Sequence, residues 1–445
     1  MSENSNIFIN KKILIYGLGK TGISAFKFLK KNNFVFIYDD KKKIKKNKES
    51  VTFSKIKKSK FDLIILSPGI DINKCKLKKF LEKNFKKIYT DLDVFSSYFK
   101  NQCITITGTN GKSTTCRLLH DVLKQKGYDV KLAGNIGYPI LSIKNIKKSS
   151  IFVIEASSYQ LEYSKLFTSK YGAILNISVD HLERHKTLKN YISAKFRLIE
   201  NQKKNSIMFI NNNDKLIRNK IRKNKYKSKI IKVSTKLNNH YIESLKNDYF
   251  LSSSNKENLS FVIDISKKFK IQKYILTRAI RKFKGLKYRQ QIIFDNKKIS
   301  IINDSKSTSY SSSIEMLKKS EKIYWLLGGI PKKGDKFKLS NIYYKNIKGY
   351  IYGKNNKKFI ADLKNKIILK KFPNLEKAIK AIFNEIKLDN FRKKTILFSP
   401  SAASFDSFQN FEDRGAYFDK LIKKYISNIW KKYLVFFLII SGGKI

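Results

Sequence analysis

The chain has 445 residues, a hydrophobic content of 42% and a formal net charge of +61. This length exceeds what one ordinary core holds, so we expect two or three domains. The charge would suit a nucleic-acid partner, but lysines are spread along the whole chain among asparagine and isoleucine. That distribution is typical of an AT-rich coding sequence, and it argues against a dedicated nucleic-acid-binding protein.

The three cysteines lie far apart, with neither disulfide nor metal-ligand spacing, as expected of reduced thiols in the cytoplasm. The N-terminus lacks the basic and apolar regions of a signal peptide. The longest apolar run near the end, Tyr433 to Ile440, is too short to span a bilayer. We therefore expect a cytoplasmic protein without stable membrane insertion, and interpret that run as a final strand or an extension rather than a membrane-surface contact.

The first segment alternates strands with a helix. We expect strands at 12–16, 34–38 and 63–66, and a helix at 23–29. The turn Gly17 to Gly22 matches G-x-G-x-x-G, and Asp39 ends the second strand about 20 residues further on. Alone, this pattern predicts an NAD-binding domain, although a UDP group offers the same diphosphate and ribose. The turn Ser67 to Ile70 would line the same crevice.

A second unit begins with a phosphate-binding loop. The β-branched run Ile104 to Thr107 leads into Gly108-Thr109-Asn110-Gly111-Lys112-Ser113-Thr114 and then into a helical pattern. This order directs backbone N–H groups at a phosphate, lets Lys112 reach the terminal phosphates and lets Ser113 ligate Mg²⁺. The loop is shorter than the common form, and a plain glycine turn is the alternative. We favour nucleoside triphosphate binding.

Two later strands, expected at 151–154 and 173–177, are followed by polar residues that suit a metal. Glu155 follows the first strand, where such folds place a Mg²⁺ carboxylate, and an exposed loop acid is the alternative. His181 follows Asp180 after the second strand, and is either a metal ligand or an ordinary packing or surface histidine.

Lys195 interrupts the apolar stripe of a helix expected at 188–200, where it follows Leu188 and Ile192 at helical spacing. Periodicity alone favours a lysine whose stem packs while its head reaches water. The alternative is a desolvated amine that reacts with carbon dioxide, because the resulting carbamate is an anion able to hold a second Mg²⁺.

Peripheral strands and loops are expected at 201–258 and one helix at 259–283. A third series of strands, at 299–302, 323–327 and 396–398, ends in polar or glycine-rich turns, where doubly wound sheets place ligand groups. Lys306 and Arg289 could supply cations to a moving phosphoryl group, whereas the serine-rich run after Asp304 could simply form turns and caps. The sequence predicts an α/β protein with domains at 1–98, 99–286 and 287–430, and an unassigned tail at 431–445.

These pieces together resemble the Mur ligase family, from about Lys11 to about Lys424. The matching stretches occur in the family's order: Gly17 to Gly22, Ser67 to Ile70, Thr107 to Thr114, Gly134 to Gly137, Glu155 to Glu162, Asp180 to His185, Asn303 to Thr308, Ser399 to Asp406 and Phe408 to Gly415. The resemblance implies an N-terminal Rossmann-like UDP-binding domain, a central P-loop-type ATPase domain and a C-terminal Rossmann-like domain.

Within the family, the resemblance is to the members that join D-glutamate to UDP-N-acetylmuramoyl-L-alanine. It implies an acyl-phosphate intermediate, ATP, two Mg²⁺ ions, a carbamylated Lys195, and a monomer that works in cytoplasmic peptidoglycan precursor synthesis without nucleic acid. The implied catalytic residues are Lys112, Glu155, His181 and Lys195, with Ser113 and Glu155 on the first metal and His181 and Lys195 on the second.

The implied ATP contacts are Gly108, Thr109, Asn110, Gly111, Lys112, Ser113, Thr114, Asn258, Arg289, Asp304 and Lys306. The implied substrate contacts are Lys20, Thr21, Asp39 and Gly69 around UDP, then Asn135, and Thr308, Lys333, Ser404 and Phe411 around D-glutamate. Lys332 is an alternative to Lys333, because the loop Gly328 to Phe337 departs from the family pattern.

Two further departures are Tyr288, where members often have histidine before the arginine, and Pro400-Ser401-Ala402-Ala403-Ser404 in place of Pro-Ala-Cys-Ala-Ser. The rival interpretations explain less. A dehydrogenase leaves the phosphate loop without a role, a folylpolyglutamate synthase lacks the first domain, and a nucleic-acid-binding protein does not account for the order of the motifs.

Overall fold

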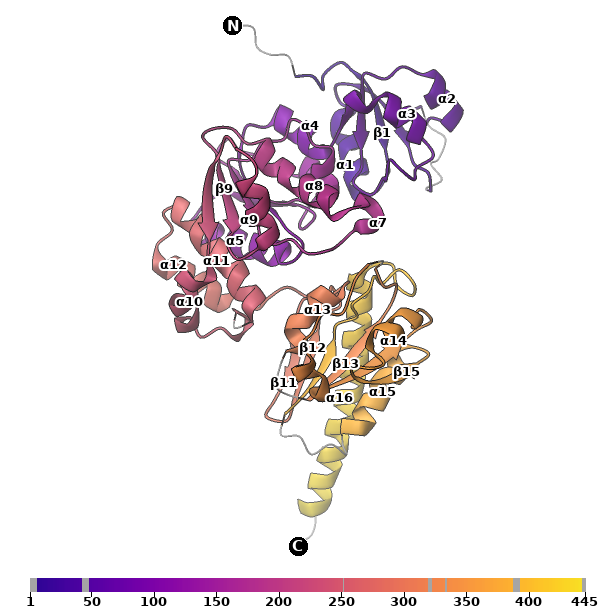
Figure 1. Ribbon diagram of the computed structural model, residues 1–445, viewed down its shortest axis with the longest axis vertical. Helices are drawn as coiled ribbons and strands as arrows, with labels where there is room; N and C mark the ends of the chain where they lie inside the picture. Colours follow the sequence, from indigo (N-terminus) through magenta and orange to yellow (C-terminus); the bar gives the residue numbers. More distant parts are fainter. Residues whose placement is uncertain are drawn as a thin grey trace. The chain divides into compact units, whose positions relative to one another are not determined.

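The computed structural model describes residues 6–41, 48–250, 252–318, 322–332, 334–386 and 393–441, with Asp248 and 427–441 as backbone only. The described residues form three α/β domains, each built on its own largely parallel sheet (Figure 1). By their contacts they group into two units, Met1–Ile177 with Leu182–Phe283, and Ser178–His181 with Lys284–Ile445. The first two sheets therefore belong to one unit and the third sheet to the other.

The N-terminal sheet has the strand order β2-β1-β3-β4, all parallel. Its elements are β1 (Lys12–Tyr16), α1 (Lys20–Leu29), β2 (Phe34–Tyr38), α2 (Phe53–Lys58), β3 (Leu63–Leu66), α3 (Lys78–Lys83), β4 (Ile88–Tyr89) and α4 (Asp91–Tyr98). The three predicted strands are confirmed, and the predicted helix begins three residues earlier than expected. Because the strand order reverses beside β1, the turns after β1 and β3 border a crevice.

A buried carboxylate joins this domain to the next. Oδ1 of Asp93 accepts hydrogen bonds from the Ser164 hydroxyl and from the backbone N–H groups of 165–167, all within 3.0 Å. Its Oδ2 accepts from the backbone N–H of Thr90 at 2.8 Å. These bonds tie α4 to the loop after α6, so the two domains form one unit.

The central sheet has the strand order β10-β9-β8-β5-β7-β6, all parallel. Its strands are β5 (Gln102–Thr107), β6 (Val130–Gly134), β7 (Ile151–Glu155), β8 (Tyr171–Ile174), β9 (Ile207–Asn211) and β10 (Lys229–Val233). Its helices are α5 (Lys112–Gln125), α6 (Ser158–Glu162), α7 (Leu182–His185), α8 (Leu188–Glu200), α9 (Lys215–Arg222), α10 (Thr235–Ser244), α11 (Ser253–Lys268) and α12 (Lys273–Lys282). Because β5 pairs with β7 on one side and β8 on the other, the loops after these strands meet.

Three predictions for this domain are wrong in detail. The single helix expected at 259–283 is two helices, because the chain turns at 269–272, where Lys270 has a φ of 49°. The first of them, α11, begins at Ser253 and so includes Asn258. The region expected to hold only peripheral strands and loops, 201–258, therefore contains the strands β9 and β10 but also the helices α9 and α10 and the start of α11. The strand expected at 173–177 is β8, which begins two residues earlier and ends at Ile174, because its partner β5 ends at Thr107, the residue paired with Ile174.

The C-terminal sheet has the strand order β11-β12-β16-β13-β14-β15, with β11 alone antiparallel. Its elements are β11 (Gln291–Asp295), β12 (Ile299–Asn303), α13 (Tyr310–Leu317), β13 (Lys322–Gly328), β14 (Ile347–Tyr352), α14 (Lys357–Leu363), β15 (Ile368–Phe372), α15 (Leu375–Ile386), β16 (Lys394–Phe398) and α16 (Phe411–Ser441). Since β16 lies between β12 and β13, the turns that follow these strands adjoin. The prediction of a final strand at 433–440 is wrong, because the backbone of α16 is helical to Ser441.

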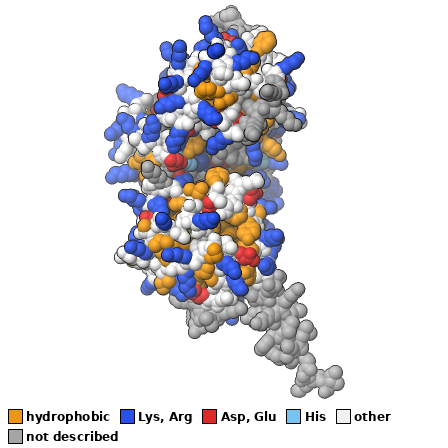
Figure 2. Space-filling view, turned by 90° about the vertical axis from the view of Figure 1, so that its right-hand side faces the viewer, with side chains coloured by type: hydrophobic (Ala, Val, Ile, Leu, Met, Phe, Trp, Pro, Cys, Tyr) orange, Lys and Arg blue, Asp and Glu red, His pale blue; other side chains and the backbone are white. Residues whose placement is uncertain are grey.

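On the face of the molecule visible in Figure 2, the positive charge is not gathered into one patch. Lysine and arginine side chains are scattered over the visible face among uncharged and apolar ones (Figure 2). Where side chains are described, no helix has both the length and the apolar character needed to cross a membrane.

Candidate active site

The loop between β5 and α5 has the backbone of a phosphate cradle. Gly108 and Gly111 have φ values of 153° and 81°, a region that favours glycine. A Cβ at Gly111 would lie 2.0 Å from Asn258 Oδ1, so a side chain there does not fit. The amide of Asn176 holds the loop from outside, because its Oδ1 accepts from Asn110 N at 2.8 Å. This geometry leaves the N-terminus of α5 beside the loop, an arrangement that suits an anion.

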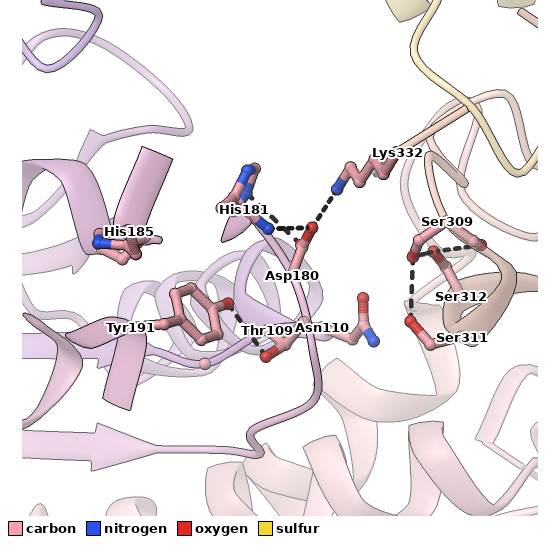
Figure 3. A network of polar contacts seen from close by, with 12 residues as sticks. Thr109, Asn110, Asp180, His181, His185, Tyr191, Ser309, Ser311, Ser312 and Lys332 are labelled. Carbon is pink, nitrogen blue, oxygen red and sulfur yellow. Dashed lines mark hydrogen bonds and ion pairs between the residues drawn. The ribbon is translucent and has the colours of Figure 1, made fainter. Parts of the chain in front are cut away.

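Two lysine ammonium groups meet at one carbonyl of this loop. Lys112 Nζ donates to Gly108 O at 2.9 Å and to Thr109 O at 2.7 Å, and Lys195 Nζ donates to Gly108 O at 2.7 Å. Lys195 is 1% exposed, and its Nζ lies 4.5 Å from the ring centroid of Tyr191. Tyr191 in turn contacts Thr109, as Figure 3 shows. The head of Lys195 does not reach water, so the interpretation of this residue as a surface-reaching lysine is wrong.

Glu155 lies beside the loop and is 1% exposed. Its Oε2 accepts a hydrogen bond from the Ser113 hydroxyl, and its Oε1 accepts from Asn135 Nδ2 at 2.9 Å. In the described part of the chain no group of three or more His, Cys, Asp or Glu residues converges. Mg²⁺ usually takes one or two carboxylates together with substrate phosphates, so a hydroxyl and a carboxylate at a phosphate loop fit that ion.

Asp180 and His181 lie in the segment that groups with the C-terminal unit. Asp180 Oδ1 forms an ion pair with Lys332 Nζ, and His181 Nε2 lies 3.5 Å from Asp180 Oδ2 (Figure 3). The backbone of His181 is left-handed, with a φ of 54°. Lys332 is thus placed against a carboxylate, whereas Lys333 lies outside the described residues.

A cavity of about 570 Å³ occupies the crevice beside β1 and extends to the central domain. All five residues that the sequence assigned to this part of the substrate line it: Lys20, Thr21, Asp39, Gly69 and Asn135. Asp39 also holds the glycine turn, because its Oδ2 accepts from Leu18 N at 2.6 Å. Asn135 reaches both this cavity and Glu155, so the cavity adjoins the phosphate loop.

Several other cavity residues were missed. They include Asp40, Lys41, Lys74, Cys75, Ser157 and Gln160. Ser157 and Gln160 form a capping box at the start of α6, with Gln160 Oε1 accepting from Ser157 N at 3.2 Å. The Ser-x-x-Gln spacing after a buried strand is the sequence signal that would have found this pair.

In the C-terminal unit, Asp304 follows β12 and is 5% exposed. Its Oδ1 accepts from Gln290 N at 3.0 Å and its Oδ2 from the Ser399 hydroxyl at 2.9 Å. Burial raises the pKa of this carboxyl to about 7, although both hydrogen bonds oppose the shift. Asp304 is therefore poised to change its charge near neutral pH.

The structure brings three predicted residues of this unit together. Lys306 Nζ lies 3.8 Å from the ring centroid of Phe411, and the guanidinium carbon of Arg289 lies 5.9 Å from the same centroid. Ser404 is buried and Thr308 is half-buried, each in a turn after a strand of this sheet.

Arg414 was not predicted, although it is fully buried at this edge of the sheet. Its guanidinium donates to Ser305 O at 2.7 Å and to Ala402 O at 3.0 Å. It thereby fixes the turn after β12 against the turn after β16. The spacing of apolar residues around Arg414 does not indicate that an arginine at the start of this helix is buried.

Comparison with known proteins agrees with this architecture. Residues 106–277 match the model of the Mur ligase middle domain, and residues 11–88 match that of the Mur ligase MurD-like N-terminal domain. The solved structure of the UDP-N-acetylmuramate-alanine ligase MurC of Thermotoga maritima is 16% identical and covers 94% of this chain and 100% of its own, with a TM-score of 0.54. This likeness shows a shared fold, and the two family models identify the first two domains as those of Mur ligases.

Relatives with similar sequences identify the branch of the family to which the chain belongs. The UDP-N-acetylmuramoylalanine–D-glutamate ligase of Rickettsia felis is 35% identical over 96% of this chain and 100% of the relative. The enzyme of the same name from Buchnera aphidicola subsp. Schizaphis graminum is 37% identical over 94% of this chain and 99% of the relative. The chain belongs to the Mur ligase family, in the UDP-N-acetylmuramoylalanine–D-glutamate ligase branch.

The close approach at Gly111 predicts a specific loss of nucleotide binding. Gly111→Ala should raise the Kd for ATP by roughly 100-fold, because the new Cβ collides with Asn258 and displaces the loop. Gly127→Ala is the matched control, since Gly127 also has a positive φ, of 97°, but a Cβ added there would meet no atom within 4 Å. Calorimetric titration with ATP measures both, and equal losses for the two variants would contradict the cradle.

Asp304 predicts a pH dependence of stability. Its pKa rises from 3.8 to about 7 on folding, so the folded protein retains this proton between those values. The stabilising contribution is complete below about pH 4 and is lost as the pH rises through about 7. Relative to Asp304→Asn, the wild type should therefore lose free energy of unfolding from pH 5 to pH 8. Urea midpoints measured at both values test this, and a constant difference would contradict the prediction.

Proposed function

We propose that this protein is the ligase that joins D-glutamate to UDP-N-acetylmuramoyl-L-alanine at the expense of ATP, in peptidoglycan precursor synthesis. The observation that carries the proposal is a phosphate loop and a nucleotide-sized cavity in one unit, connected through Asn135. The two substrates, UDP-N-acetylmuramoylalanine and D-glutamate, are taken from the names of the relatives. Asn135 supports the proposal because it lines the cavity and also donates to Glu155 beside the phosphate loop.

The cavity beside β1 suits the UDP group. Its volume falls in the range of ordinary ligand sites, about 300–1,000 Å³. Lys20, Lys41 and Lys74 line it and can neutralise a diphosphate. The N-cap of α1 is Gly19, whose lack of a side chain leaves the first N–H groups of this helix open to a phosphate.

The ATP phosphates would lie at the N-terminus of α5. Lys112 can exchange its two carbonyl contacts for phosphate oxygens without leaving the loop. A carboxylate oxygen of the first substrate attacks the terminal phosphorus, and ADP leaves. The D-glutamate amine then attacks the acyl carbon, phosphate leaves and the nitrogen loses a proton. Arg289 and Lys306 are the cations that we assign to the transferred phosphoryl group.

Ser113 and Glu155 would hold one Mg²⁺, and His181 with a carbamylated Lys195 the other. These ions would supply positive charge to the crowded phosphate and acyl oxygens. The burial of Lys195 supports the modification, since an amine that gives up its proton can attack carbon dioxide to form an N–C bond. The carbamate keeps one N–H, which can still donate to Gly108 O.

We assign Thr308, Ser404 and Phe411 to the D-glutamate pocket, together with one lysine of the loop after β13. The ion pair with Asp180 supports Lys332 for this role, because its ammonium already faces a carboxylate. Lys333 is the alternative by sequence.

The reaction predicts ADP release that depends on D-glutamate. Purified protein with Mg-ATP and UDP-N-acetylmuramoyl-L-alanine is assayed with D-glutamate, L-glutamate, L-alanine or meso-diaminopimelate, and the mass of the product is measured by mass spectrometry. Only D-glutamate should support turnover. Activity with another amino acid alone would overturn the acceptor, and silence of folded protein with all four would overturn the reaction.

Lys112→Ala provides the internal test of the phosphate loop. It should lower kcat by roughly 100-fold or more, because the ammonium that we assign to the ATP phosphates is lost. Lys124→Ala removes a lysine from the last turn of the same helix and should retain activity.

A further inference from the structure

A closed group of buried hydroxyls lies behind the strand ends of the C-terminal sheet. The hydroxyl of Ser313, in α13, lies 2.7 Å from those of Ser307 and Ser399 and 2.6 Å from that of Ser401. All four residues are at most 2% exposed. Buried hydroxyls need partners, and here they are partners for one another.

The direction of every hydrogen bond in this group follows from Asp304. The Ser399 hydroxyl donates to Asp304 Oδ2, which uses its single proton. Ser313 must then donate to Ser399, and Ser307 and Ser401 must both donate to Ser313. Each hydroxyl donates once, and Ser313 accepts twice with its two lone pairs. All four hydroxyl protons are used in these four hydrogen bonds. The charge of Asp304 therefore sets which hydroxyl donates and which accepts in each bond.

Two members of this group, Ser307 and Ser401, lie in the two turns that carry the proposed D-glutamate pocket. Ser307 immediately precedes Thr308, and Ser401 lies three residues before Ser404. Ser401 has a φ of 56°, an unfavourable backbone conformation for serine that the surrounding contacts must hold. Ser313 is thus the one hydroxyl bonded to the other three.

We propose that Ser313 is a positioning residue that couples the nucleotide-side carboxylate Asp304 to the D-glutamate pocket, through the turns at Ser307 and Ser401. The inference rests on the proposed function and deepens it. When Asp304 is ionised, the hydroxyl chain points toward it and fixes both turns. Without the Ser313 hydroxyl, Ser307 and Ser401 must turn to the carbonyls of Ser309 and Ser399, each 3.4 Å away, and the turns that carry Thr308 and Ser404 shift with them.

A second serine group on the same helix provides the control. Ser309 contacts the hydroxyls of Ser311 and Ser312 at 3.0 and 2.7 Å, at the start of α13 (Figure 3). Ser311 and Ser312 are half-buried, and the hydrogen bonds among these three residues stay within one turn. Ser312→Ala therefore removes a hydroxyl from the same helix without touching the group around Ser313.

The test compares Ser313→Ala with Ser312→Ala in the steady-state assay. Ser313→Ala should raise the KM for D-glutamate about tenfold, while the KM for UDP-N-acetylmuramoyl-L-alanine stays within twofold, because that cavity lies in the other unit. Ser312→Ala should change neither value. An unchanged KM for D-glutamate, or an equal rise for all three substrates, would overturn the positioning role.

A second readout does not need turnover. The difference in free energy of unfolding between a protein with Asp304 and its Asp304→Asn variant changes with pH. When both proteins also carry Ser313→Ala, this change should occur at higher pH, because Ser399 loses the donor that strengthens its hydrogen bond to ionised Asp304. Arg289 and Arg414 are the charged groups that act on Asp304, and both are retained in the variants. A pH profile identical to that of the wild type would overturn the coupling. If the wild type itself is inactive with D-glutamate, the proposed function fails, and this profile still tests the hydroxyl group.

Discussion

The geometry of the site depends on one carbonyl oxygen, that of Gly108, where two lysine ammonium groups from different helices meet. Lys112 belongs to the first turn of α5 and Lys195 to the buried stripe of α8, so this oxygen fixes two helices and a strand end together. Gly108 has a φ of 153°, a backbone conformation that favours glycine at this turn. The same turn leaves the N–H groups of α5 directed outward, where an anion can bind.

In the first domain, the cavity that we assign to the UDP group also depends on a glycine turn held in place, here by Asp39. Its G-x-G-x-x-G turn and Asp39 are equally compatible with a dinucleotide, and the motif alone could not decide between the two. The choice between a dinucleotide and a UDP group rests on the residues that adjoin the cavity. Asn135 borders the cavity and hydrogen-bonds Glu155 beside the phosphate loop, so a ligand in the cavity would lie near that loop, which favours our assignment of a UDP group over a dinucleotide. The distributed positive charge favours anionic ligands generally and needs no nucleic-acid partner.

How much the sequence predicts depends on how local the signal is. The strands β1, β2 and β3 have the predicted bounds, because continuous apolar runs between turn residues leave few alternatives. The break between α11 and α12 was missed, since Lys270 has no composition signal for a left-handed turn. For Lys195, periodicity favoured a head that reaches water, and only its packing against Tyr191 and Gly108 shows that the head is buried. Arg414 acts through Ser305 and Ala402, which belong to other turns, and no local pattern encodes such partners.

The central claim is that the phosphate loop serves to activate a carboxylate, and the path of one oxygen atom tests it most directly. UDP-N-acetylmuramoyl-L-alanine labelled with heavy oxygen in its terminal carboxylate is converted in the presence of ATP and D-glutamate, and the inorganic phosphate is analysed by mass spectrometry. If the carboxylate attacks the terminal phosphorus, one labelled oxygen leaves with each phosphate. Unlabelled phosphate, formed together with the amide product, would contradict the account.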